Sequence, residues 1–231
     1  MLAGVLALQG DFAEHLAVLE ECGADGVAVR TAGGLEQVDA LVIPGGESTT
    51  MLKLIDRFEL RDLLRKRIND GLPVFGTCAG AIVLARASAD GYAGSSLDRA
   101  VSRKRLSENP PSDVGGTPPT GGSERVRQQA ATPPNPPLGV LDLSVVRNAY
   151  GRQVDSFETE LEIAGVGPVH AIFIRAPVFE DAGPGVEVLA EWGGRAVLVR
   201  AGNILASAFH PELAGDLRLH RYFLEHVAGG G

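Results

Sequence analysis

The chain has 231 residues, of which 45% are hydrophobic, with a formal net charge of −8 and two cysteines. An acidic chain without a basic stripe argues against nucleic acid as the main partner, and no apolar run approaches the length of a membrane span. Two cysteines do not form a disulfide framework, and the N-terminus lacks the positive region of a signal peptide, so a cytoplasmic protein with reduced thiols is expected.

Short apolar runs alternate with helical patterns in the first part of the chain. GVLALQ, GVAVR, ALVIPGG and LPVFG are typical of strands, whereas DFAEHLAVLEECG, STTMLKLIDRFELRDLLRKRINDG (one or two helices) and AGAIVLARA favour helices. From residue 138 onward, LGVLDLSVV, VHAIFIRAPV, VEVLAEW, RAVLVRAG and NILASAFH indicate strands, and DLRLHRYFLEHVA indicates a closing helix. The alternation predicts an α/β fold, in which a largely parallel central sheet is covered on both faces, in a single domain over 1–231.

Residues 88–137 interrupt this pattern. They contain eight of the fourteen prolines, many Gly, Ser and Thr, and few large apolar residues. This composition predicts a disordered, low-complexity insertion within the domain.

The stretch PVFGTCAGAIVLA joins a predicted strand to a predicted helix through Gly76-Thr77-Cys78-Ala79-Gly80. This is the pattern of a nucleophile elbow with cysteine in place of serine. The glycines would allow strand and helix to pass closely, and the helix N-terminus would favour a thiolate at Cys78. The alternative is that Cys78 is a small buried hydrophobic residue.

A base for this thiol is predicted in SAFHPE, where His210 ends an apolar strand and Glu212 follows two residues later. Positions i and i+2 of an extended segment share a side, so the carboxylate could orient the imidazole and complete a Cys-His-Glu triad. The pair could equally be an ordinary strand end. The other histidines, at positions 15, 170, 220 and 226, are interpreted as surface or packing residues.

PGGEST, residues 44–49, follows the strand ALVI. The backbone N–H of Gly46, together with that of Ala79, is a candidate oxyanion donor. The stretch could also be a plain turn with Ser48 as the helix N-cap.

Taken together, the cysteine elbow, PGGEST and HPE resemble class I, triad-type glutamine amidotransferases. LALQGDFAEH, VIPGGESTTM, RNAYGRQVDSFE, FIRAP and SAFHPEL resemble, more narrowly, glutaminase subunits of pyridoxal 5′-phosphate synthase. Residues 88–137 depart from this resemblance, because family members connect the same elements by a short loop.

The resemblance implies hydrolysis of L-glutamine to L-glutamate and ammonia, without a cofactor or metal. Cys78 would attack the amide, His210 would move protons and Glu212 would orient His210. The glutamine pocket would be lined by Gly46, Glu47, Ser48, Arg147, Ile174 and Arg175. From the residues alone, the two arginines could equally form surface salt bridges. The ammonia would pass to a synthase subunit that uses ribose 5-phosphate and glyceraldehyde 3-phosphate. Docking of that subunit is expected to flip the Gly45-Gly46 peptide, with Gln9 as a candidate contact.

Three alternatives remain open. The chain could be the glutaminase subunit of another ammonia-using enzyme, such as imidazole glycerol phosphate synthase. It could be a Cys-His hydrolase acting on peptides or small acyl compounds. It could also be a non-catalytic interaction module, if the insertion disables the site.

Overall fold

The computed structural model describes residues 1–90, 135–147 and 156–229, and the statements below concern these residues. The predicted insertion at 88–137 therefore lies almost entirely outside the described residues. The same holds for residues 148–155, which form most of the stretch RNAYGRQVDSFE.

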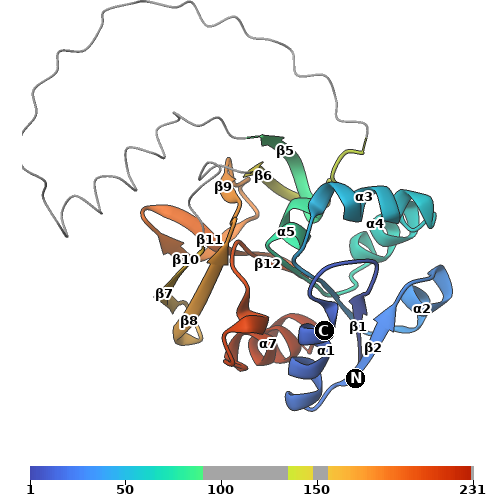
Figure 1. Cartoon of the computed structure of the whole chain (residues 1–231), viewed down its shortest axis with the longest axis horizontal. Coiled ribbons are helices and arrows are strands. Elements are labelled where there is room, and N and C mark those ends of the chain that lie inside the picture. The colour runs from blue at the N-terminus through green and yellow to red at the C-terminus, as the bar shows by residue number, and fades with distance from the viewer. Residues whose placement is uncertain (91–134, 148–155, 230–231) are drawn as a thin grey trace, which may run out of the picture.

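A seven-stranded sheet forms the centre of the molecule, with strand order β10-β11-β12-β4-β3-β1-β2 (Figure 1). The five strands from β12 to β2 run parallel, and β10 and β11 extend this sheet in antiparallel fashion. The strands are β1 (Leu2–Leu6), β2 (Asp25–Val29), β3 (Ala40–Ile43), β4 (Val74–Thr77), β10 (Glu187–Trp192), β11 (Arg195–Ala201) and β12 (Ile204–Ser207).

The three middle strands of the seven-stranded sheet are buried at every position; they are β3, β4 and β12. Continuous apolar runs such as ALVI suit strands that are covered on both faces, as parallel strands are. The carboxyl ends of these strands meet at one edge, where parallel α/β sheets carry their ligand sites.

Helices cover both faces of the sheet and make it the middle of three layers. Figure 1 shows α1 beside α7 on one side, and α3, α4 and α5 on the other. The helices are α1 (Phe12–Glu21), α2 (Ala32–Gln37), α3 (Ser48–Arg57), α4 (Arg61–Asn69), α5 (Ala79–Leu84) and α7 (Arg218–Tyr222), with the 3-10 turn η1 (Pro211–Leu213) and the π-helix η2 (Phe223–Ala228). The buried side chains of these layers form one hydrophobic core. Within the described residues, no helix is both long and apolar enough to cross a membrane.

Two small sheets stand beside the central one. The first has the order β5-β6-β9 and the second pairs β7 with β8 in antiparallel fashion. Their strands are β5 (Ala85–Asp90), β6 (Leu141–Arg147), β7 (Ser156–Ile163), β8 (Gly167–Ile174) and β9 (Val178–Glu180).

The predicted α/β fold is confirmed, but several boundaries differ. The long helical pattern after PGG, for which one or two helices were expected, forms two: α3 and α4 divide near Glu59, whose φ of 55° cannot continue a helix. AGAIVLARA was expected to be one helix, yet α5 ends at Leu84 and β5 begins at the next residue. Helix α2 and strand β7 were not predicted. Two glycines weaken the helical pattern of α2, and alternating glutamates in β7 place it half in solvent.

Candidate active site

The Cys78 elbow joins β4 to α5 with a strained backbone. Cys78 has a φ of 47° and a ψ of −101°, and its side chain is buried. A Cβ on Gly76 would approach the backbone of Gly80 and Ala81 at 2.8 and 2.9 Å, and one on Gly80 would overlap the carbonyl of Ile43. Both glycines are therefore required for the close crossing of strand and helix, and the positive φ is typical of a nucleophile elbow.

His210 reaches the elbow because β12 is the parallel neighbour of β4. Ser207 pairs with Thr77 in the sheet register, and the next amide of β4, that of Cys78, donates to the Ser207 carbonyl at 2.8 Å. The chain then continues for three residues to His210, whose own amide donates to the carbonyl of Ile172 at 2.9 Å. The two residues thus meet at the carboxyl edge of adjacent strands.

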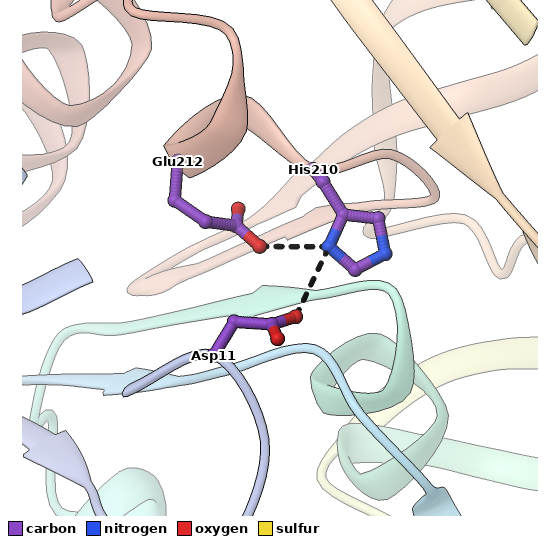
Figure 2. Close-up of side chains that lie close together, drawn as sticks. All are labelled: Asp11, His210 and Glu212. Atoms are coloured by element: carbon purple, nitrogen blue, oxygen red, sulfur yellow. Dashed lines mark hydrogen bonds and ion pairs between the residues drawn. The ribbon is translucent and has the colours of Figure 1, made fainter. Parts of the chain in front are cut away.

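Glu212 lies behind the His210 ring, as Figure 2 shows. His210 Nδ1 and Glu212 Oε1 are 2.7 Å apart, and the Glu212 side chain is fully buried in the turn η1. Burial by itself would lower the pKa of His210, but hydrogen bonding with Cys78 and Glu212 outweighs it and raises this pKa to about 10. His210 therefore holds a proton at neutral pH, so its ring can act as a general acid.

Asp11 is a second carboxylate beside the same ring, and sequence analysis missed it. Its Oδ2 lies 3.5 Å from His210 Nδ1, the same nitrogen that Glu212 approaches (Figure 2). Asp11, His210 and Glu212 offer potential metal-ligand atoms that all lie within 4.8 Å of one another. However, the nitrogen involved already shares a proton with Glu212 at hydrogen-bond distance. The cluster is better explained as two carboxylates around one imidazole N–H.

A cavity of about 450 Å³ opens at this edge of the sheet. Cys78 and His210 lie in its wall, whereas Glu212 is behind it. Each of the residues predicted to bind glutamine or the oxyanion lies in the wall as well. The lining residues are Asp11, Gly46, Glu47, Ser48, Thr49, Cys78, Ala79, Ile82, Arg147, Ile174, Arg175, Pro177, His210 and Leu213.

The two glycines of PGGEST have different neighbours. A Cβ on Gly45 would overlap the His210 imidazole, so this glycine makes room for the base. Gly46 has a φ of 139°, and a Cβ there would approach the Gln9 amide at 2.7 Å. Gln9 Oε1 also accepts from the Glu47 backbone N–H at 3.1 Å. The turn after β1 therefore packs directly on the glycine loop.

Glu47, rather than Ser48, is the N-cap of α3. Its carboxylate accepts from the backbone N–H groups of Thr49 and Thr50 at 2.9 and 2.6 Å. Burial raises the pKa of Glu47, but these hydrogen bonds from Thr50 and Thr49 outweigh it and lower this pKa to about 2. The cavity wall thus carries a fixed negative charge at the helix end, and the alternative reading with Ser48 as N-cap is wrong.

The two arginines come from the small sheets. Arg147 ends β6, and its Nη1 donates to Thr49 Oγ1 at 3.0 Å. Arg175 follows β8, is exposed at the cavity, and has a φ of 44°. The preceding residue of β8, Ile174, offers its carbonyl to the Cys78 sulfur at 3.9 Å. The end of β8 therefore contacts the nucleophile and presents a cation beside it.

His15 and His220 were interpreted as surface or packing residues, and both prove to be fully buried. His15 Nδ1 lies 3.0 Å from His220 Nε2, and His15 Nε2 lies 3.1 Å from Thr77 Oγ1. A histidine in an amphipathic helix gives no sign of a polar partner on another element, so this arrangement could not be predicted.

Other cavity residues were also missed by sequence analysis. They are Asp11, Thr49, Ile82, Pro177 and Leu213. Each of them lies within four residues of a residue named in the sequence analysis. This closeness along the chain was the only sequence feature that could have pointed to them. Which of them face the cavity depends on the turns.

Comparison with known proteins agrees with this geometry. The profile of the SNO glutamine amidotransferase family matches residues 5–103 and 121–229, and the gap in this match falls inside the predicted insertion. The chain is 47% identical over 235 residues to "Pyridoxal 5'-phosphate synthase subunit PdxT" of Nocardia farcinica, covering 99% of this chain and 86% of the relative. It is 48% identical over 225 residues to the protein of the same name from Thermus thermophilus, covering 97% and 96%. A crystal structure described as a glutamine amidotransferase superimposes with a TM-score of 0.77 at 46% identity, over 98% of both chains.

Proposed function

Because the chain belongs to the SNO glutamine amidotransferase family, we propose that it is the glutaminase subunit of a pyridoxal 5′-phosphate synthase. It hydrolyses L-glutamine to L-glutamate and ammonia. The observation that carries this conclusion is the convergence of Cys78, His210 and Glu212 at a cavity lined by two arginines. Residues 1–231 act as one glutamine amidotransferase domain in this proposal.

The triad accounts for each proton and bond of the reaction. The Cys78 thiolate attacks the side-chain amide carbon, and the carbonyl oxygen becomes an oxyanion. The His210 imidazolium gives its proton to the amide nitrogen, the C–N bond breaks and ammonia leaves. His210 then takes a proton from water as the water attacks the thioester, and the C–S bond breaks to release glutamate. Glu212 holds His210 in the required orientation throughout.

The backbone N–H groups of Gly46 and Ala79 are the proposed oxyanion donors. Within the described residues, neither N–H donates to a backbone carbonyl in a turn or between two elements. Since α5 has only six residues, we assign most of the thiolate stabilisation to His210 rather than to the helix dipole.

The charges of the cavity wall match the two ends of an amino acid. Arg175 and Arg147 would bind the α-carboxylate, since a guanidinium donates to a carboxylate in a planar fork. Glu47, negatively charged at neutral pH, would face the α-ammonium group. Ser48 and Ile174 line the space between these charges and the nucleophile.

The proposed partner of the chain is a synthase subunit that accepts the ammonia. The relatives are named as subunits of pyridoxal 5′-phosphate synthase, which supports a multi-subunit enzyme. The contact between Gln9 and Gly46 gives this partner a route to the active site. The Gly45-Gly46 peptide can adopt two orientations at low cost, because neither residue has a Cβ. A docked subunit that moves Gln9 would change which of the two orientations is more stable. The chain alone should therefore be a poor glutaminase.

The test is glutamate and ammonia release from L-glutamine, measured with and without the synthase subunit, and with Cys78→Ser as the inactive control. We expect slow release that rises at least about tenfold on addition of the synthase, a shift in population typical of a coupled two-state site. Release without the synthase that does not change on its addition would overturn partner dependence. No release under either condition would overturn the glutaminase assignment itself.

The same assay separates the alternatives. Activation by an imidazole glycerol phosphate synthase subunit, but not by a pyridoxal phosphate synthase subunit, would identify the other partner. Hydrolysis of peptides or small esters in preference to glutamine would indicate a general Cys-His hydrolase. Binding to the synthase without any turnover would indicate an interaction module.

A further inference from the structure

One oxygen of the Glu212 carboxylate is hydrogen-bonded to His210, and the other has no hydrogen-bond donor in the described part of the chain. Oε1 lies 2.7 Å from His210 Nδ1, whereas Oε2 is buried without a hydrogen-bond partner among the described residues. Burial raises the pKa of Glu212, and the hydrogen bond and charge of His210 only partly oppose this. A second donor at Oε2 would favour the ionised form that orients an imidazolium.

A candidate donor from another element is His15 of α1, which is fully buried. His15 Nε2 lies 3.4 Å from Glu212 Oε2, and both side chains are fully buried. The same nitrogen lies 3.1 Å from the hydroxyl of Thr77, the residue before the nucleophile. His15 therefore contacts the carboxylate of the triad, Glu212, and also Thr77, which precedes the cysteine of the triad.

The protonation state of His15 follows from its surroundings. Burial, and then the neighbouring His220 and His210, hold the pKa of His15 well below its usual range, and burial lowers that of His220 to about 4. Both rings are thus neutral at pH 7, and each carries one N–H. Across the 3.0 Å contact between His15 Nδ1 and His220 Nε2, one ring must donate and the other accept.

One of the two tautomer arrangements fits better. If His15 donated through Nδ1, its Nε2 lone pair would face the anionic Glu212 Oε2, and His220 Nδ1 would be a buried N–H without an acceptor. If His220 Nε2–H donates to His15 Nδ1, then His15 Nε2–H donates to Thr77 Oγ1 and lies close to Glu212 Oε2, although it is not aligned for a hydrogen bond with that oxygen. The atoms left unpaired, His220 Nδ1 and Glu212 Oε2, are then acceptors only. Orphaned buried donors are the rarer case, so the second arrangement is favoured.

We propose that His15 is a positioning residue of the triad: its Nε2–H, held by Thr77, presents a positive edge to the second oxygen of Glu212, and His220 fixes the tautomer of His15. This rests on the proposed glutaminase function. The triad then continues behind the cavity as a buried chain from η1 through α1 to α7. A buried polar network of this kind holds its members in one geometry when each is satisfied.

The test compares two substitutions at His15. His15→Phe keeps a ring of similar shape without an N–H, and His15→Gln places an amide donor near the position of Nε2. We expect His15→Phe to lower kcat about tenfold with KM almost unchanged, and His15→Gln to restore part of it, as for coupled residues in one hydrogen-bond network. Active sites are counted by labelling Cys78 with an alkylating glutamine analogue, so that loss of folded protein does not count as loss of kcat.

A second readout is the pH dependence. Without the His15 donor, Glu212 should take up a proton at higher pH, and the acidic limb of the kcat profile should move to higher pH. The groups facing Glu212 are His210, His15 and Asp11, and those facing His15 are Thr77, Glu212, His210 and His220. A merely structural role for His15 would lower the melting temperature but leave the acidic limb in place. The exposed His226 serves as control through His226→Gln, which should change neither readout.

A third measurement tests the role of His15 without turnover, so its result does not depend on whether the chain is a glutaminase. The rate at which iodoacetamide alkylates Cys78, followed by mass spectrometry apart from Cys22, reports the thiolate–imidazolium pair without any turnover. We expect a several-fold slower reaction near pH 6 in His15→Phe than in the unchanged protein. If His15→Phe does not fold, His220→Phe, which frees the tautomer of His15, should give the same direction of change. Equal kcat, equal acidic limb and equal alkylation rates in these variants would overturn the proposal.

Discussion

The central sheet and the two small sheets contribute different parts of the site. The central sheet provides Cys78 and His210, both buried, just after the neighbouring parallel strands β4 and β12. A backbone hydrogen bond to Ser207 holds Cys78 across this sheet, and one to Ile172 of β8 holds His210. The small sheets provide Arg147 and Arg175 at the ends of β6 and β8, where the side chains are partly buried or exposed. In the proposed function, the central sheet therefore carries the chemistry, and the small sheets carry the charge that would select the substrate.

This difference has a physical basis. A nucleophile and its base must stay within hydrogen-bond distance, and parallel strands in a packed core hold such distances closely. Binding of a carboxylate by a guanidinium tolerates more movement, because a long side chain can adapt. Substitutions in the central sheet should therefore change kcat, and those in the small sheets should change KM.

The largest effect is expected at the nucleophile. Cys78→Ser should lower glutamine hydrolysis by at least about 10³-fold while leaving the melting temperature nearly unchanged, because the reaction loses its thiolate but the core loses no volume. An alkylating glutamine analogue should label Cys78 and spare Cys22, which is only partly buried at the end of α1. Loss of activity with labelling at Cys22 would contradict the assignment.

A steric change beside the base should come next. The Cβ introduced by Gly45→Ala would overlap the His210 imidazole and displace it from Cys78, so kcat should fall by about 10²-fold, the cost of a misplacement near 1 Å. Gly33→Ala in α2 is the matched control, since nothing lies within 4 Å of that position. Comparable kcat values for the two variants would show that His210 has room to move.

A smaller effect is expected in the small sheets. Arg175→Gln should raise KM for glutamine by about tenfold with kcat nearly unchanged, because it removes one charge-assisted hydrogen bond made in both ground and transition states. Arg218→Gln, which removes an exposed arginine paired with Asp216, should leave both constants unchanged. If Arg175→Gln lowers kcat instead, the division between chemistry and binding is wrong.

The last expected effect is on stability rather than on turnover, and it concerns the acid stability of the helices behind the triad. The pKa of His220 is lowered by burial to about 4 in the folded protein, against 6.5 unfolded, so the unfolded chain binds more protons between these values. The contribution of His220 to stability is fully present above pH 6.5 and falls as the pH drops toward 4, by about 2 kcal/mol between pH 7 and 4.5.

This is measured by denaturant unfolding at both pH values. His220→Phe should show a smaller loss between pH 7 and 4.5 than the unchanged protein, whatever its stability at pH 7. His226→Gln, at an exposed position, should keep the full loss. An unchanged loss in His220→Phe would mean that His220 is not the group that titrates.

The sequence by itself determined the features that depend on local backbone and spacing. The alternation of apolar runs and helical patterns predicted the α/β fold. Glycines on both sides of Cys78 predicted a close strand–helix crossing, and Gly76 and Gly80 indeed leave no room for a Cβ. The pairing of His210 with Glu212 was predicted as well, but the expected extended backbone is wrong: Pro211–Leu213 form the 3-10 turn η1, and this turn brings the carboxylate to the imidazole.

The tertiary structure alone decided what lies beside and behind these motifs. Asp11 reaches His210 because the turn after β1 ends at the same sheet edge as β12. His15 and His220 meet because α1 and α7 pack on the same face, although they are 205 residues apart. The sequence pattern of a helix predicts which of its faces is buried. It does not predict which polar group of another element packs against that face.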